Sequence, residues 1–162
     1  MLTVNGIAMV IAVLLCVPAV FIVSPSALWE EKALLKSVVL LAGIVIYMVL
    51  HELVHGICMR AISGVRPHYG FTGMYAYAGS QAYFGRTAYV FIALAPVVLW
   101  GVVLGVINFF VPLDWFWVVY IIQIGNLSGA GGDLYVTCRM ARMPADILVQ
   151  DTGVAMTVYA KQ

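Results

Sequence analysis

Charged side chains are scarce in this chain. Asp, Glu, Lys and Arg make up 9% of its 162 residues, whereas about 25% is usual for soluble domains. Hydrophobic residues reach 64%, and the mean hydropathy is +1.05. This composition excludes an ordinary soluble domain and predicts one integral membrane protein. With a net charge of only +1, the chain lacks the basic surface that nucleic acids require, so no nucleic-acid partner is expected.

Cysteine is also scarce. Cys16, Cys58 and Cys138 are odd in number and form no C-x-x-C pair. A disulfide framework is therefore not expected, and the three residues are read as small buried hydrophobes. The sequence contains no internal repeat and no low-complexity segment, and it is too short for two large domains.

One polar cluster interrupts a long apolar stretch. His51, Glu52 and His55 form an H-E-x-x-H motif, and residues four apart on a helix lie on one face, so both imidazoles can reach one metal ion. A glutamate beside them can take a proton from a metal-bound water. Two helix histidines that merely bond their neighbours would be the simpler interpretation. Ionisable groups are costly inside a membrane helix, however, so the motif favours a compensating zinc ion.

Four apolar stretches predict an all-α polytopic membrane protein with about four transmembrane helices, a short β-like loop and a small C-terminal tail. The expected helices cover about residues 7–24, 37–60, 87–107 and 113–138. Pro18 interrupts the first stretch and no basic residue precedes it, so it is read as a retained helix and not a signal peptide. Ala95-Pro96 predicts a kink or close packing in the third. The Gly-rich end of the fourth permits close helix approach or local unwinding.

Two segments outside these helices have the pattern of short strands. Residues 63–86 contain five glycines and many aromatics, which indicates strands with Gly turns. This segment is either an interfacial aromatic loop or a sheet edge that pairs with an extended substrate. In the tail, residues 147–149 and 154–159 are strand-like, and Asp151-Thr152-Gly153 between them is similar to an aspartic peptidase triplet. A simple turn is the natural interpretation of that triplet.

The distribution of basic residues predicts the orientation. With four spans, the 63–86 loop lies on the same side as both termini, together with six basic residues: Arg60, Arg66, Arg86, Arg139, Arg142 and Lys161. The other side holds two, Lys32 and Lys36. The positive-inside rule then places the loop and both termini in the cytoplasm.

A catalytic zinc ion needs a third protein ligand besides the two histidines. Of the seven acidic residues, only Glu52 and Asp133 fall within expected spans apart from Asp114, which belongs to the turn at the start of the fourth. At 1.5 Å per residue, His51 lies about 21 Å along its helix and Asp133 about 27 Å along the fourth. These depths agree within the uncertainty of the helix ends, so Asp133 is the leading candidate. His68, in the loop after the motif helix, and Cys58, on the same stripe as the histidines, stay open as alternatives.

These residues resemble the site-2 protease family of intramembrane zinc metalloproteases. The likeness is carried by H-E-L-V-H at residues 51–55, by Ala95-Pro96 in the next helix, and by Asn126 with the Gly-rich stretch that ends at Asp133. It covers about residues 37–160 and extends to small prokaryotic membrane proteins described as zincin peptidases. In the site-2 family the Asp stands in an Asp-Gly context after prolines, whereas here the glycines precede Asp133 and no proline does.

The resemblance implies Zn²⁺ bound by His51, His55 and Asp133, with Glu52 as the general base and Asn126 steadying the oxyanion. The chain is expected to consist of a transmembrane metalloprotease-like domain over residues 1–142 and a cytoplasmic tail over 143–162. The expected activity is zinc-dependent endopeptidase hydrolysis near the cytoplasmic side of the cell membrane. The partners would be the lipid bilayer and a membrane or membrane-associated protein substrate; the oligomeric state does not follow from the sequence.

The alternative from another class is a non-catalytic membrane protein whose metal site is structural or sensing. Such a site would be closed by a fourth protein ligand, for which Cys58 and His68 are the candidates. An open metal position that faces a water-filled cleft would instead favour the enzyme.

Overall fold

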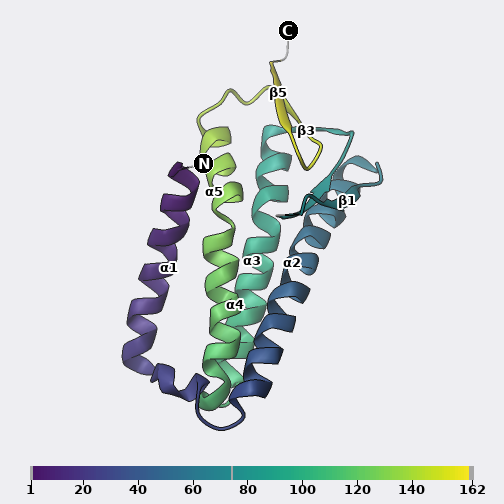
Figure 1. The fold of residues 1–162 in the computed structure, drawn as a ribbon. Helices are drawn as coiled ribbons and strands as arrows, with labels where there is room; N and C mark the ends of the chain where they lie inside the picture. Colours follow the sequence, from purple (N-terminus) through teal and green to yellow (C-terminus); the bar gives the residue numbers. More distant parts are fainter. Residues whose placement is uncertain (1, 74, 161–162) are drawn as a thin grey trace. The chain divides into compact units, whose positions relative to one another are not determined.

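The computed structural model describes residues 2–73 and 75–160, which form five α-helices and two small sheets (Figure 1). Lys161, one of the basic residues counted above, and Gln162 lie outside the described residues. The helices are α1 (Leu2–Ile22), α2 (Ala33–Ser63), α3 (Arg86–Phe110), α4 (Phe116–Gly129) and α5 (Gly131–Ala141). Short 3₁₀ turns, η1 (Pro25–Leu28) and η2 (Leu113–Trp115), precede α2 and α4.

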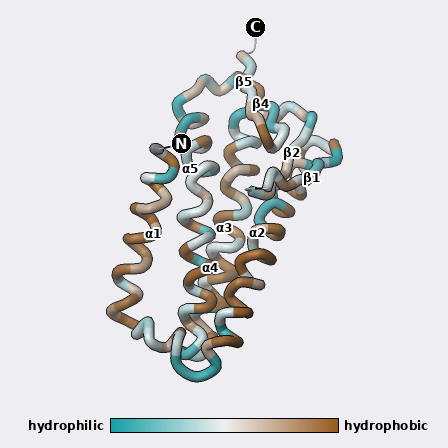
Figure 2. Tube along the Cα trace, viewed as in Figure 1, coloured by the Kyte–Doolittle hydropathy of each residue, from teal (hydrophilic) through white to brown (hydrophobic). Residues whose placement is uncertain are grey.

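Three of the described helices, α1, α2 and α3, are long and apolar enough to cross a bilayer. Figure 2 shows hydrophobic residues along most of α1 and along much of α2. Many of the large apolar side chains on these helices are exposed. Their exposure is expected where lipid, and not protein, covers a helix.

The expected fourth span, residues 113–138, is not one helix. It is divided into η2, α4 and α5, with a break at Ala130, whose φ and ψ are −73° and 15°. Glycines at 125, 129, 131 and 132 surround the break, and glycine is the poorest helix former after proline. The break places Asp133 in the first turn of α5, where the helix dipole favours a carboxylate.

The five strands form two antiparallel sheets. β1 (His68–Phe71) pairs with β2 (Ala76–Gly79), so the 63–86 segment contains strands, as expected. In the second sheet, β4 (Ile147–Asp151) lies between β3 (Tyr83–Gly85) and β5 (Met156–Ala160). The strands and the turn expected in the tail are confirmed, and Gly153 adopts a φ of 80° in that turn. The pairing of β4 with β3 shows that the tail packs on the segment before α3.

Contacts divide the chain into two compact units. The first comprises Met1–Tyr47 and Val97–Gly132. Its small apolar cluster includes Trp117, whose indole nitrogen donates to the Ser24 carbonyl at 3.1 Å. Lys36 is almost completely buried in this unit; its Nζ donates to the Ala27 carbonyl at 2.8 Å and lies 3.9 Å from Asp114.

The second unit comprises Met48–Pro96 and Asp133–Gln162. Its core consists of Met59, Phe84, Tyr89, Ile92, Met140, Ile147 and Val149. The Asp151 carboxylate ties this core to the C-terminal hairpin, because it accepts from the Tyr89 hydroxyl and from the Gly153 amide. This unit contains the H-E-x-x-H motif and Asp133.

Candidate metal centre

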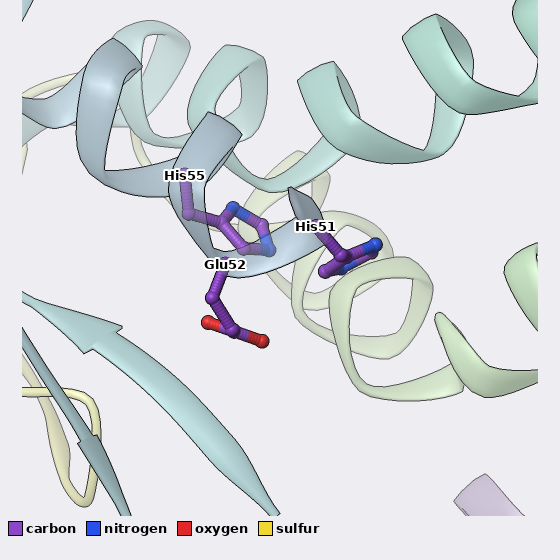
Figure 3. Close-up of side chains that lie close together, drawn as sticks. All are labelled: His51, Glu52 and His55. Atoms are coloured by element: carbon purple, nitrogen blue, oxygen red, sulfur yellow. The ribbon is translucent and has the colours of Figure 1, made fainter. Parts of the chain in front are cut away.

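His51, Glu52 and His55 project from consecutive turns of α2 and gather at one place (Figure 3). One possible ligand atom from each residue lies within 4.8 Å of those of the other two. The two imidazole centroids are 4.9 Å apart. The uninterrupted helix from Ala33 to Ser63 produces this arrangement, since its pitch brings residues 51 and 55 to one face.

Asp133 reaches both histidines from the first turn of α5. Its two carboxylate oxygens lie 3.4 Å from Nε2 of His51 and 3.6 Å from Nε2 of His55. Zinc–nitrogen and zinc–oxygen bonds of 2.0–2.2 Å at a tetrahedral angle separate neighbouring ligand atoms by about 3.4 Å. Each of these two distances is thus close to the spacing of neighbouring zinc ligands, and two imidazoles with one carboxylate are donors that zinc accepts.

A backbone carbonyl fixes the orientation of the His55 ring. Nδ1 of His55 lies 3.0 Å from the carbonyl oxygen of Ile92 in α3. That oxygen lacks its usual helical donor, because the residue four positions later is Pro96, which has no N–H. When Nδ1 donates its proton to Ile92, the lone pair of Nε2 is available for a metal ion.

Glu52 lies beside the first sheet. The backbone amide of Ala78 in β2 is close enough to the Glu52 carboxylate to stabilise its charge. The C-terminal hairpin keeps β2 in place, because the Ser80 amide donates to the Asp151 carbonyl at 2.7 Å. A Cβ atom at Gly79 would overlap the backbone of Thr152, so the turn of the hairpin packs directly on the strand.

The remaining candidate residues have other surroundings. Asn126 belongs to the first unit and is fully buried; its Nδ2 donates to the Val97 carbonyl at 3.1 Å, and its Oδ1 accepts from Tyr47 at 2.9 Å. Nε2 of His68 lies 3.2 Å from the Thr152 carbonyl. Cys58 is partly buried and packs against the core of the second unit. The structure thus brings Asp133 within 4 Å of the two imidazoles. Among the described residues, the group of close ligand atoms comprises His51, Glu52 and His55, without His68 or Cys58.

A family model described as "Putative zincin peptidase" matches residues 44–148. The match covers 105 of the 162 residues, and it includes the motif, Asp133 and the start of β4. The chain belongs to this zincin peptidase family. Membership confirms the expected class, a zinc metallopeptidase, and it implies zinc as the metal, which the grouping of His51, Glu52 and His55 fits. No curated protein and no solved structure matches the chain.

Two contributors to this zincin centre were not identified from the sequence. The Ile92 carbonyl and the Ala78 amide are backbone groups, so residue identity gives no direct signal for either. Pro96 was noticed, but only as a kink. Counting four residues back from it would have identified the Ile92 carbonyl as one whose usual helical N–H donor is missing.

Proposed function

We propose that this zincin peptidase is a membrane endopeptidase of the site-2 protease type. In this proposal His51, His55 and Asp133 hold Zn²⁺. The observation that carries it is the spacing of the Asp133 oxygens from both Nε2 atoms, 3.4 and 3.6 Å. Three protein ligands leave a tetrahedral ion one open position, which is the arrangement of catalytic and not of structural zinc sites.

Glu52 is the proposed general base. Zinc held at this centre would polarise the scissile carbonyl and acidify the attacking water. Glu52 would take the proton from that water and deliver it to the leaving amine. The grouping of its carboxylate with the two imidazoles supports this role. The nearby Ala78 amide of the first sheet would favour the charged carboxylate that a general base requires.

The same sheet suggests how a substrate would align. Among the described strands, β2 pairs only with β1, so its other edge has no strand partner. An extended peptide could add to that edge beside Glu52, with backbone hydrogen bonds giving affinity. The oxyanion role expected for Asn126 stays a prediction, and it would require the amide nitrogen to leave the Val97 carbonyl.

The proposed site of cleavage is near the cytoplasmic side of the cell membrane. The apolar helices support a membrane location, and the six basic residues against two support cytoplasmic termini. The proposed substrate is accordingly a membrane or membrane-associated protein.

The test is metal analysis of the purified full chain, combined with cleavage of membrane-spanning reporter peptides in reconstituted vesicles. We expect about one zinc per chain, loss of cleavage on chelation, and recovery when zinc is returned. A chain that holds zinc but cleaves no peptide of a broad panel would instead support the non-catalytic metal site. Cleavage that persists after complete removal of the metal would contradict the proposal.

A further inference from the structure

A groove lies on the side of α2 that faces away from the metal centre. Its volume is about 390 Å³, and it is lined by Leu53, Gly56, Ile57, Arg60, Arg66, Pro67 and Tyr69. Leu53 and Ile57 each follow a motif histidine by two residues, which is about 200° around a helix. Leu53 and Ile57 therefore point away from the two imidazoles, and the groove opens on a part of α2 whose apolar side chains are exposed.

The wall of the groove opposite α2 is built by close packing. Tyr69, in β1, lies against Gly56, and a Cβ atom at residue 56 would overlap the Tyr69 phenol. Gly56 is buried, whereas Leu53, Ile57 and Tyr69 are 41%, 55% and 48% exposed. The small residue thus lets the aromatic ring stand beside the helix and leaves the apolar side chains open to a ligand.

Two arginines stand at one end of the groove. Arg60 is in the last turn of α2, and Arg66 follows in the loop before β1. Within residues 2–73 and 75–160, neither guanidinium has a carboxylate within 4.0 Å. The groove contains no acidic residue. Two guanidinium groups without a carboxylate partner form a site that suits a phosphate group.

The exposed apolar helix face on which the groove opens continues one turn beyond its lining, to Val49, and together they have the depth of one lipid leaflet. Val49, Leu53 and Ile57 recur at four-residue spacing, and Arg60 follows three residues later, so all four share one helix face. From Arg60 back to Val49 the helix rises about 16 Å. Half of the hydrocarbon core of a bilayer is about 15 Å. An acyl chain that begins at Arg60 would therefore reach the midplane beside Val49.

We infer that this groove holds one anionic phospholipid, with its phosphate on Arg60 and Arg66 and an acyl chain along Ile57, Leu53 and Val49. The face of the helix and the leaflet-matched depth favour a lipid over a peptide substrate. An anionic headgroup is favoured over a zwitterionic one because no carboxylate is present to receive a headgroup ammonium. The inference requires that α2 cross the membrane, but it does not depend on peptidase activity.

The experiment compares two double variants that remove the same charge. The purified full chain is titrated with phosphatidylglycerol or with phosphatidylcholine of identical acyl chains, and bound lipid is counted by native mass spectrometry. Arg60→Gln/Arg66→Gln should weaken phosphatidylglycerol binding by roughly thirtyfold, from two basic residues near an anionic headgroup. Arg139→Gln/Arg142→Gln, which changes two exposed arginines of α5 and the following turn, should retain the affinity of the wild type.

Further variants distinguish the contribution of the acyl chain to lipid binding from that of the phosphate. Ile57→Ser, which keeps both arginines, should weaken retention of the phospholipid but not of inorganic phosphate. The single variant Arg66→Gln, which lies outside α2 and so leaves the helix unchanged, should also weaken phosphatidylglycerol binding. Glu52→Gln should bind the lipid as the wild type does. Equal binding of the two lipids to the wild type would overturn the inference. So would equal losses in the two double variants, since bulk charge alone would then account for the affinity.

Discussion

Glu52 distinguishes an enzyme from a metal-binding scaffold at the level of a single residue. Its carboxylate lies beside the imidazoles, but the Asp133 oxygens already occupy positions suited to a third ligand. We expect Glu52→Gln to keep zinc and fold while cleavage falls by about 10²–10⁴-fold, the usual contribution of general acid–base catalysis. Zinc content, thermal unfolding and peptide cleavage are measured together, with the exposed Glu31→Gln as the control. Cleavage by Glu52→Gln at the rate of the wild type would contradict the proposed mechanism.

Substitution of Asp133 tests whether this residue is the third metal ligand. Replacing it with alanine removes the carboxylate that approaches both Nε2 atoms, so zinc affinity should fall by more than about a hundredfold, the upper range for residues outside the coordination shell. Asp146→Ala, at an exposed position, should leave it unchanged. The measurement is competition with a fluorescent zinc chelator. If Asp133→Ala keeps its affinity while His68→Ala or Cys58→Ala loses it, the third ligand is that residue instead.

Pro96 carries a prediction at the level of the helix. Alanine at this position would restore an N–H directed at the Ile92 carbonyl, which would then compete with His55 Nδ1 for the same oxygen. Alanine is also the better helix former by about 3 kcal/mol. Pro96→Ala should therefore raise thermal stability and yet weaken zinc binding by about tenfold, as expected for a residue that orients a ligand.

The control for this variant is Pro18→Ala, because Pro18 is the other proline within a described helix and lies in the first unit. It should change stability without changing zinc affinity. An unchanged zinc affinity in Pro96→Ala would show that the two donors share the lone pairs of the Ile92 oxygen without cost.

The helices and the motif could be predicted from the sequence because their signals are local. Apolar runs revealed α1, α2 and α3, and four-residue spacing placed His51 and His55 on one face. The break at Ala130 was not predicted, since glycines only permit a helix to end and packing decides where it does. The pairing of β3 with β4 joins residues more than sixty positions apart, and the Tyr89–Asp151 bond is of the same kind. Contacts between residues so far apart leave no periodic pattern in the sequence of either segment, so they could not be predicted from it.

At the scale of the whole molecule, the pairing of β3 with β4 constrains the topology. β3 ends at Gly85, directly before α3, and β4 follows α5. If α3 crosses the bilayer, the chain must return to the side where α3 began before β4 can pair. Only α4 and α5 are available for that return. We therefore propose four crossings, with α4 and α5 together forming the fourth, although neither alone has the length of a span.

This topology is tested by labelling of introduced cysteines in a variant without Cys16, Cys58 and Cys138. Glu31→Cys, in the segment between α1 and α2, should react with a membrane-impermeant maleimide in intact cells. Asp146→Cys, directly before β4, should react only after the membrane is permeabilised. Both positions are exposed. Labelling of both from the same side would contradict an odd number of crossings between them, and the reversed pattern would move the accessible substrates to the other compartment.

If Asp133 binds the metal, as proposed, its position in the chain also determines when the centre can form during synthesis. Asp133 follows His55 by 78 residues, and ribosomes add about 5–20 residues per second. For roughly 4 to 16 s, therefore, a nascent chain carries both imidazoles and Glu52 with no carboxylate from α5. Metal loading must wait for the second half of the polypeptide. In that interval the motif helix is an unfinished membrane segment, which the insertion machinery must hold until its partner has been made.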